Sequence, residues 1–200
     1  MKSRSGERTL LASVVLSSPG PVVVGIGLLL GRSSTQLADF IRRTAELVAI
    51  IVSWAIFRIT NRGAEFDADR KARLEGIANR CVGAAMCLGG AAMIIVALVS
   101  ESGEKGNVIP GLVIAILGVI TNCWFWLRYR ILDKAHANAI LAAQSQLYRA
   151  KTLVDACVTA ALATVAVAPA SAAAVYMDNA GSIVVAGYLI VNGVLAIRGR

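Results

Sequence analysis

Residues 76–100 read GIANRCVGAAMCLGGAAMIIVALVS, and this stretch decides the fold class. Its one charged side chain, Arg80, lies near its beginning, and aliphatic and small residues make up most of the rest. A helix of about 20 mainly apolar residues crosses a hydrocarbon core of about 30 Å. We therefore predict that this stretch forms a transmembrane helix.

Five further segments share this character, and together they predict an all-α integral membrane protein, a bundle of six transmembrane helices. The six segments are 9–31, 34–57, 76–100, 108–127, 135–167 and 180–197. Pro19, Gly20 and Pro21 predict a kink in the first, because proline removes a backbone donor and crowds the preceding turn. The composition agrees, since 57% of the 200 residues are hydrophobic and 16% are charged. Such a composition excludes a disordered chain and argues against a water-soluble enzyme.

The basic residues, which give a net charge of +8, divide unevenly between the two sides of this predicted bundle. One side carries Lys2, Arg4, Arg8, Arg58, Arg62, Arg70, Lys71, Arg73, Arg128, Arg130, Lys134, Arg198 and Arg200. The other side has Arg32 and Lys105. The positive-inside rule then places both termini in the cytoplasm, and it explains the surplus charge without a nucleic-acid partner. We expect an integral protein of the bacterial inner (plasma) membrane, with the lipid bilayer around it.

Signals for enzyme chemistry are missing from the sequence. The four cysteines form no C-x-x-C pair and read as small buried hydrophobic residues; they are Cys81, Cys87, Cys123 and Cys157. His136 is the one histidine, and a single histidine does not make a metal site. Without a nucleophile–base pair, a glycine-rich phosphate loop or a histidine cluster, we expect no enzyme activity, no cofactor and no metal ligands.

Charged side chains inside two of the apolar segments mark the candidate site. They are Asp39, Arg42, Arg43, Glu46, Lys151 and Asp155. A charge near the bilayer centre costs at least ~2.5–3.5 kcal/mol on insertion scales, so such residues usually face a bundle interior and pair. On a helix the first four form one stripe about 100° wide. Ser53 extends this stripe, and in segment 135–167 Gln144 and Tyr148 share a face with the charged pair. We predict that the two polar faces meet.

The two carboxylates also share a depth in this prediction. Glu46 and Asp155 each lie about 20 Å from the outer end of their helix at 1.5 Å per residue. Arg42 precedes Glu46 by one turn, and Lys151 precedes Asp155 by one turn, so each carboxylate has a cation on its own helix. Two interpretations stay open: an ion-pair clasp that holds the helices together, and a site on a transport pathway. Intramembrane ionisable groups are usually functional, which favours the pathway.

Four short motifs follow one another along the chain. They are Ser33, Leu37, Ala38 and Asp39 in S-x-x-x-L-A-D; Glu75, Ile77 and Ala78 in E-x-[LI]-A; Lys151 and Asp155 in K-x-x-x-D; and Met177-Asp178-Asn179 before a final small-residue stretch ending at Arg198. In these motifs and in its six segments, the chain resembles the cation diffusion facilitator family over nearly all of its length. The resemblance implies a six-helix transmembrane domain over 1–200 with both termini cytoplasmic. Because the chain stops at Arg200, we expect no C-terminal cytoplasmic domain.

The departures from the family pattern concern its metal site. In the family, four His or Asp side chains on helices two and five hold zinc or a similar ion, and Arg42, Glu46, Lys151 and Asp155 occupy those positions here. Arginine has no lone pair to donate, and lysine would first have to lose a proton. With Asp39 and Arg43 the cluster holds equal numbers of cations and anions. We therefore expect weak zinc binding or none at this site.

Three functions are compatible with this pattern. The first is a facilitator-type transporter or antiporter of a cation other than a chelated transition metal, in which Glu46 and Asp155 respond to a proton or to the cation and Arg42 and Lys151 tune their pKa values or gate access. The second is divalent-metal efflux through a relocated set, Asp39, Glu46, Asp155 and Cys157; Cys157 points about 200° from Asp155, which counts against it. The third is a non-transporting scaffold or partner subunit with an ion-pair clasp. The resemblance also suggests a homodimer, although the family's cytoplasmic domain supplies much of that contact.

Overall fold

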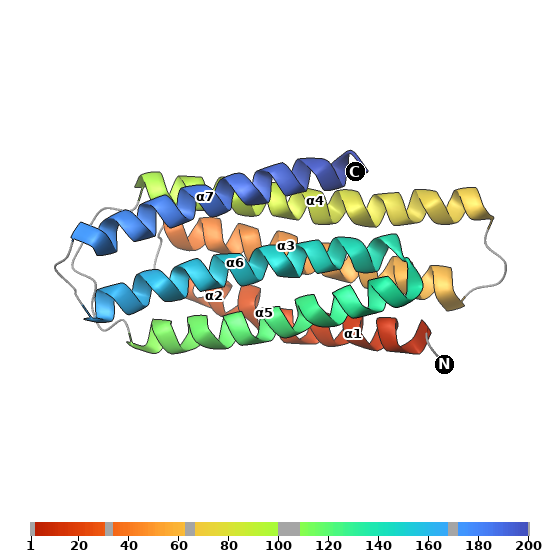
Figure 1. Cartoon of the computed structure of the whole chain (residues 1–200), viewed down its shortest axis with the longest axis horizontal. Coiled ribbons are helices and arrows are strands. Elements are labelled where there is room, and N and C mark those ends of the chain that lie inside the picture. Colours follow the sequence, from red (N-terminus) through yellow and green to blue (C-terminus); the bar gives the residue numbers. More distant parts are fainter. Residues whose placement is uncertain (1–2, 31–33, 63–66, 100–108, 168–171, 200) are drawn as a thin grey trace.

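The chain forms one bundle of long helices, which run along a common axis in the computed structural model (Figure 1). The structure describes residues 3–30, 34–62, 67–99, 109–167 and 172–199. Within them the elements are α1 (Ser3–Ser17), α2 (Pro19–Leu30), α3 (Ser34–Arg62), α4 (Ala68–Val99), α5 (Ile109–His136), α6 (Ala139–Val167) and α7 (Ala172–Ile197), and no strand occurs in these ranges. The predicted all-helical class is therefore confirmed.

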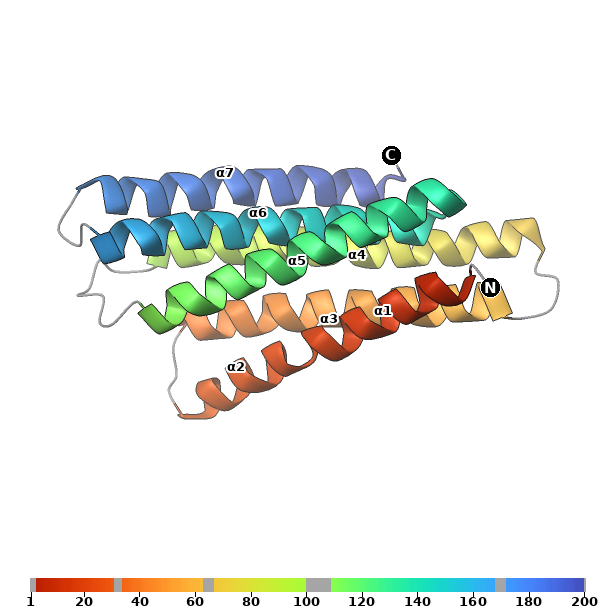
Figure 2. The same cartoon turned by 60° about the horizontal axis from the view of Figure 1, so that its bottom comes forward.

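The first predicted segment is divided into two helices. α1 ends at Ser17 and α2 begins at Pro19, and Figure 2 shows α2 following α1 along one flank of the bundle. Proline is tolerated at the first position of a helix, because the N–H that it lacks would have no partner there. We predicted a kink at Pro19, Gly20 and Pro21; the structure instead has a break between two helices at Ser18, immediately before these residues. The other five segments correspond to α3–α7.

The boundary between α5 and α6 differs from the prediction. The predicted segment starts at residue 135, but that residue still belongs to α5, and α6 begins at Ala139. Asn138 caps α6, since its side-chain oxygen accepts hydrogen bonds from the backbone N–H groups of Ile140 (3.0 Å) and Leu141 (3.3 Å). Ala137 has a φ of 46°, a left-handed conformation that reverses the chain.

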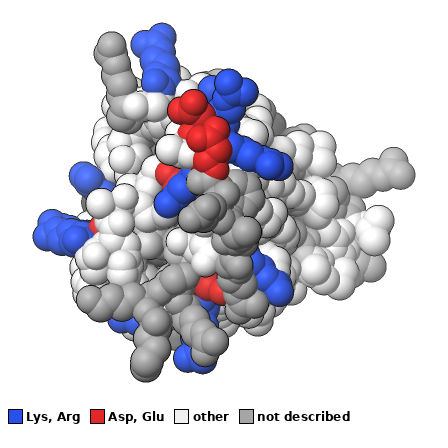
Figure 3. Space-filling view, turned by 90° about the vertical axis from the view of Figure 1, so that its right-hand side faces the viewer, with Lys and Arg blue, Asp and Glu red and all other residues white. Residues whose placement is uncertain are grey.

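The connections alternate between the two ends of the bundle. The start of α1, the end of α3, the start of α4, the α5–α6 turn and the end of α7 lie at one end (Figure 1). Viewed onto this end, lysine and arginine side chains lie along much of the rim, with acidic side chains among them (Figure 3). Three spans of the described chain are long and apolar enough to cross a membrane: Ser5–Ile26, which comprises most of α1 and α2, Ala68–Leu98 and Leu112–His136. Ile183–Ile197 is a shorter apolar helix. α3 and α6, which carry the predicted site, are not among those three.

Close packing joins α4 and α7. A Cβ atom added at Gly83 would lie 2.5 Å from the backbone oxygen of Gly193, and one added at Gly193 would lie 2.7 Å from that of Gly83. Both positions therefore require glycine, which lets the two backbones touch, as is common between helices in membranes. α3 packs along α4, and α6 packs along α5, so α3 and α6 approach each other from two helix pairs.

A buried aromatic cluster fixes α1 against α5 and α6. The ring centroid of Tyr148 lies 4.9 Å from that of Phe125 and 5.4 Å from that of Tyr129. The Tyr129 hydroxyl is 2.7 Å from the Ser13 hydroxyl, and the Tyr148 hydroxyl is 3.3 Å from that of Ser17. These hydrogen bonds satisfy the polar ends of two buried rings and hold three helices around one end of the candidate site.

Candidate functional site

A cavity of about 550 Å³ lies among the α1–α2 junction, α3, α5 and α6. It collects the predicted charged residues whose side chains the structure describes, which are Arg42, Arg43, Glu46, Lys151 and Asp155. The side chain of Asp39, the sixth predicted residue, lies outside the described part. The polar faces of α3 and α6 therefore meet near the middle of the two helices, as we predicted from the helical spacing of the charged residues.

An ion pair crosses this cavity from α6 to α3. Lys151 Nζ lies 3.1 Å from Glu46 Oε2, and the two side chains are 17% and 12% exposed. The ammonium group also lies 5.1 Å from the ring centroid of Tyr148, which is within the range of a cation–π contact. The sequence placed a cation beside each carboxylate on its own helix, whereas the structure joins Glu46 to the cation of the other helix.

Asp155 has a different partner. Its Oδ2 accepts a hydrogen bond of 2.6 Å from the side-chain amide of Asn122 on α5. A Cβ atom added at Gly118, one turn before Asn122, would lie 2.7 Å from the same oxygen. Gly118 therefore leaves the room that the carboxylate occupies, and Asn122 orients it. We did not predict either residue from the sequence. A polar residue and a glycine one turn apart on one face of an apolar helix could have indicated a polar contact there.

The two arginines of α3 extend toward different helices. A Cβ atom added at Gly20 of α2 would lie 3.4 Å from a guanidinium nitrogen of Arg43, and one added at Gly89 of α4 would lie 3.5 Å from Cγ of Arg42. Both arginines line the cavity together with Glu46. The described lining thus combines fixed cations with two carboxylates, so a cation inside it competes with the protein's own positive groups.

A neutral polar contact lies beside the charged cavity. Gln144 of α6 donates a 2.8 Å hydrogen bond to the Ser53 hydroxyl of α3, and both side chains are fully buried. Ser53 follows Glu46 by about two turns and Gln144 precedes Lys151 by about two turns, so this contact lies toward the end that holds both termini. It is a second polar contact between α3 and α6, in addition to the ion pair. The side-chain oxygen of Gln144 has no hydrogen-bond partner among the described residues.

Metal-ligand chemistry has little support in this arrangement. Within the described ranges, no group of three or more His, Cys, Asp or Glu side chains could hold a metal ion. Cys157 is not among the residues that line the cavity, so the relocated set with Asp39, Glu46 and Asp155 is not assembled by the part that the structure describes. His136 is exposed at the end of α5. The four cysteines are free thiols and half-buried, rather than fully buried as expected.

The sequence was compared with known proteins. Residues 10–199 match the family model described as the cation efflux transmembrane domain. No curated protein matches the chain. The matched region contains all of α3 to α7 and therefore every element that carries a charged residue of the cavity.

Proposed function

Because the chain belongs to the cation efflux family, we propose that it moves a cation across the membrane through the cavity between α3 and α6. The family match confirms the resemblance to cation diffusion facilitators that the motifs indicated, and it supports an integral membrane protein and a cation transporter of this kind. Glu46 and Asp155 are the groups that bind the cation or the proton, and Arg42 and Lys151 are the fixed counter-charges.

One observation carries this proposal: the charged residues line a cavity of about 550 Å³ instead of packing into a solid core. A structural ion pair needs only its partner, whereas a transport site needs space for cargo next to the groups that bind it. In this cavity the Lys151 ammonium occupies the position beside Glu46 that a cargo cation would take. Binding of cargo therefore requires that the ion pair opens, which couples occupancy to a movement of α6 relative to α3.

The same arrangement supports proton-driven antiport as part of this proposal. The described lining holds three cations and two carboxylates, so a cation enters at the least electrostatic cost when another positive charge leaves. The basic end of the bundle in Figure 3 supports the cytoplasmic assignment of both termini under the positive-inside rule. With α1 and α2 counted as one interrupted helix, the proposed topology has six transmembrane helices. The bacterial inner membrane and a homodimer stay predictions.

A second function has a specific observation in its favour. The Glu46–Lys151 pair is short, at 3.1 Å, and mostly buried, as expected of a clasp in a non-transporting scaffold or partner subunit. The two functions differ in one physical property of the cavity. A transport site must exchange with water, whereas a clasp is stable in a dry bundle.

Thr121→Cys should react with a water-soluble, membrane-impermeant thiol reagent. Thr121 is exposed and lines the cavity, and only the hydrated thiolate reacts with such reagents. Its neighbour Ile120 is 61% exposed but lies outside the cavity lining, so Ile120→Cys should face lipid and stay unlabelled. The measurement is labelling by mass spectrometry in proteoliposomes, with the four native cysteines changed to serine. Equal protection of both positions would favour the clasp.

A further inference from the structure

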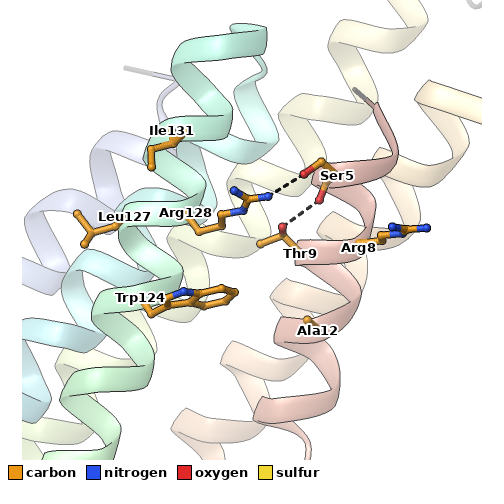
Figure 4. Close-up of a pocket in the computed structure, with 8 residues that line it drawn as sticks. All are labelled: Ser5, Arg8, Thr9, Ala12, Trp124, Leu127, Arg128 and Ile131. Atoms are coloured by element: carbon orange, nitrogen blue, oxygen red, sulfur yellow. Dashed lines mark hydrogen bonds between the residues drawn. The ribbon is translucent and has the colours of Figure 1, made fainter. Parts of the chain in front are cut away.

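A second cavity, of about 700 Å³, lies between α1 and α5, apart from the charged site. Its polar wall is formed by Ser5, Thr9 and Arg128, and its apolar wall by Ala12, Trp124 and Leu127. In Figure 4 the Arg128 guanidinium lies between the two helices, and the Trp124 ring points toward α1 below it. Arg8 also lines the cavity, but its guanidinium points away from α5 in Figure 4. Among the described residues that line the cavity there is no Asp or Glu.

Both walls change from polar to apolar at one level. Arg128 follows the apolar segment 108–127 directly, and Thr9 begins the apolar segment 9–31. The two helices are tied at this level, since Arg128 Nη2 donates a 2.9 Å hydrogen bond to the Ser5 hydroxyl. Trp124 lies one turn deeper and is exposed, as tryptophans at the border between headgroups and hydrocarbon commonly are. The cavity therefore spans the border between headgroups and acyl chains.

We propose that this cavity binds an anionic glycerophospholipid. The headgroup phosphate accepts hydrogen bonds from the Arg128 guanidinium and from the Ser5 hydroxyl, and one acyl chain lies along Trp124 and Ala12. The inference rests on insertion of the chain in a membrane and does not depend on transport.

The chemistry of the cavity selects this ligand class. Arginine binds phosphate through several N–H donors, and Arg128 uses one of its five for Ser5. The Ser5 hydroxyl accepts that bond and keeps its own hydrogen for a second acceptor. Because the described lining has no carboxylate, its positive charge selects a headgroup with net negative charge. The apolar wall below requires a ligand with a hydrocarbon chain, which a free phosphate lacks.

Quenching of tryptophan fluorescence by brominated lipids tests this proposal. The protein is placed in phosphatidylcholine nanodiscs that contain a small fraction of phosphatidylglycerol with bromine on its acyl chains. The comparison uses brominated phosphatidylcholine at the same fraction. Brominated phosphatidylglycerol should quench with about fivefold higher apparent affinity, as expected for one arginine near a membrane surface. In Trp124→Phe the difference should disappear, which identifies the reporting residue.

Matched variants locate the site. Arg128→Gln should remove the preference, whereas Arg130→Gln, an exposed arginine of the same helix outside the cavity, should keep it. Ala12→Phe keeps Arg128 and Ser5 but fills the apolar wall, so it should also remove the preference, even if Arg128→Gln does not fold. Equal quenching by the two lipids, or a preference that survives in both Arg128→Gln and Ala12→Phe, would overturn the proposal. Full competition by soluble glycerol phosphate would overturn the lipid assignment.

Discussion

Lys151→Met should lower the free energy of unfolding by about 3–5 kcal/mol, whereas the double change Glu46→Leu with Lys151→Met should cost far less. The single change leaves the Glu46 carboxylate, whose side chain is 12% exposed, without the ammonium that lies 3.1 Å from it. The double change removes both charges, so neither is left in the cavity without compensation. The single change costs more stability than the double change because it leaves one desolvated charge without a partner, whereas the double change leaves none.

Thermal unfolding of both variants in one detergent measures this difference. Arg149→Met is the matched control, because Arg149 is an exposed basic residue of α6 outside the cavity lining. It loses a cation–π contact with Tyr188 (5.6 Å), which is worth only about 0.5–1 kcal/mol at an exposed site, so this variant should unfold near the temperature of the unaltered protein. If Lys151→Met unfolds at the same temperature as the control, then water in the cavity, or Arg42 and Arg43 in its lining, compensates the charge of Glu46. That outcome would contradict the expected penalty and would also remove the support for a clasp.

The triple variant Arg42→His, Glu46→Asp and Lys151→His, with Asp155 kept, should bind zinc or cadmium at least about tenfold more tightly than the unaltered protein, which is ~1.4 kcal/mol. All four positions line one cavity, and each pair projects from one side of its helix. The variant supplies four nitrogen and carboxylate ligands of the kind that zinc prefers. It also removes two cations that repel a divalent ion.

Calorimetric titration at neutral pH, with parent and variant in the same detergent, tests this rebuilt site. The same triple variant with Asp155→Asn is the control, because it lacks one of the four ligands and should lose most of the gain. If a folded triple variant shows no gain over the parent, then α3 and α6 do not have the facilitator register at these positions.

The sequence predicted the helices because apolar segments long enough to cross a membrane are a strong signal. The residues at which the helices begin and end were harder to predict from the sequence. Residues 135–136 continue α5 without a compositional break, and the turn depends on a cap at Asn138 and on a left-handed Ala137. A single capping residue is a weak signal of a helix boundary when the sequence on both sides of it remains mainly apolar. The interruption of the first segment was predictable because two prolines and a glycine mark it.

Five of the six predicted charged residues line one cavity, but the pairing among them was not predictable. A charge in an apolar helix is costly, so its presence and its helical face are visible in the sequence. Which charges meet depends on how α3 packs on α4 and α6 on α5, and no spacing within one helix determines this. For that reason Glu46 pairs with Lys151 across helices. Asn122 is uncharged, so its presence in an apolar helix indicated a functional site much less strongly than that of Asp155, which it contacts.

Cation-dependent proton flux in proteoliposomes tests the central claim most directly. Liposomes that contain a pH-sensitive dye are supplied with a panel of monovalent and divalent cations, and the unaltered protein is compared with Glu46→Gln plus Lys151→Gln and with Arg149→Met. We predict that at least one cation drives flux in the unaltered protein and in Arg149→Met. The double variant leaves neither charge unpaired and should stay folded. Its flux should be at least about tenfold slower, as expected when ~1.4 kcal/mol or more of binding free energy is removed. If no cation drives flux in the folded unaltered protein, or if the double variant transports as fast, the cavity between α3 and α6 is not a transport site.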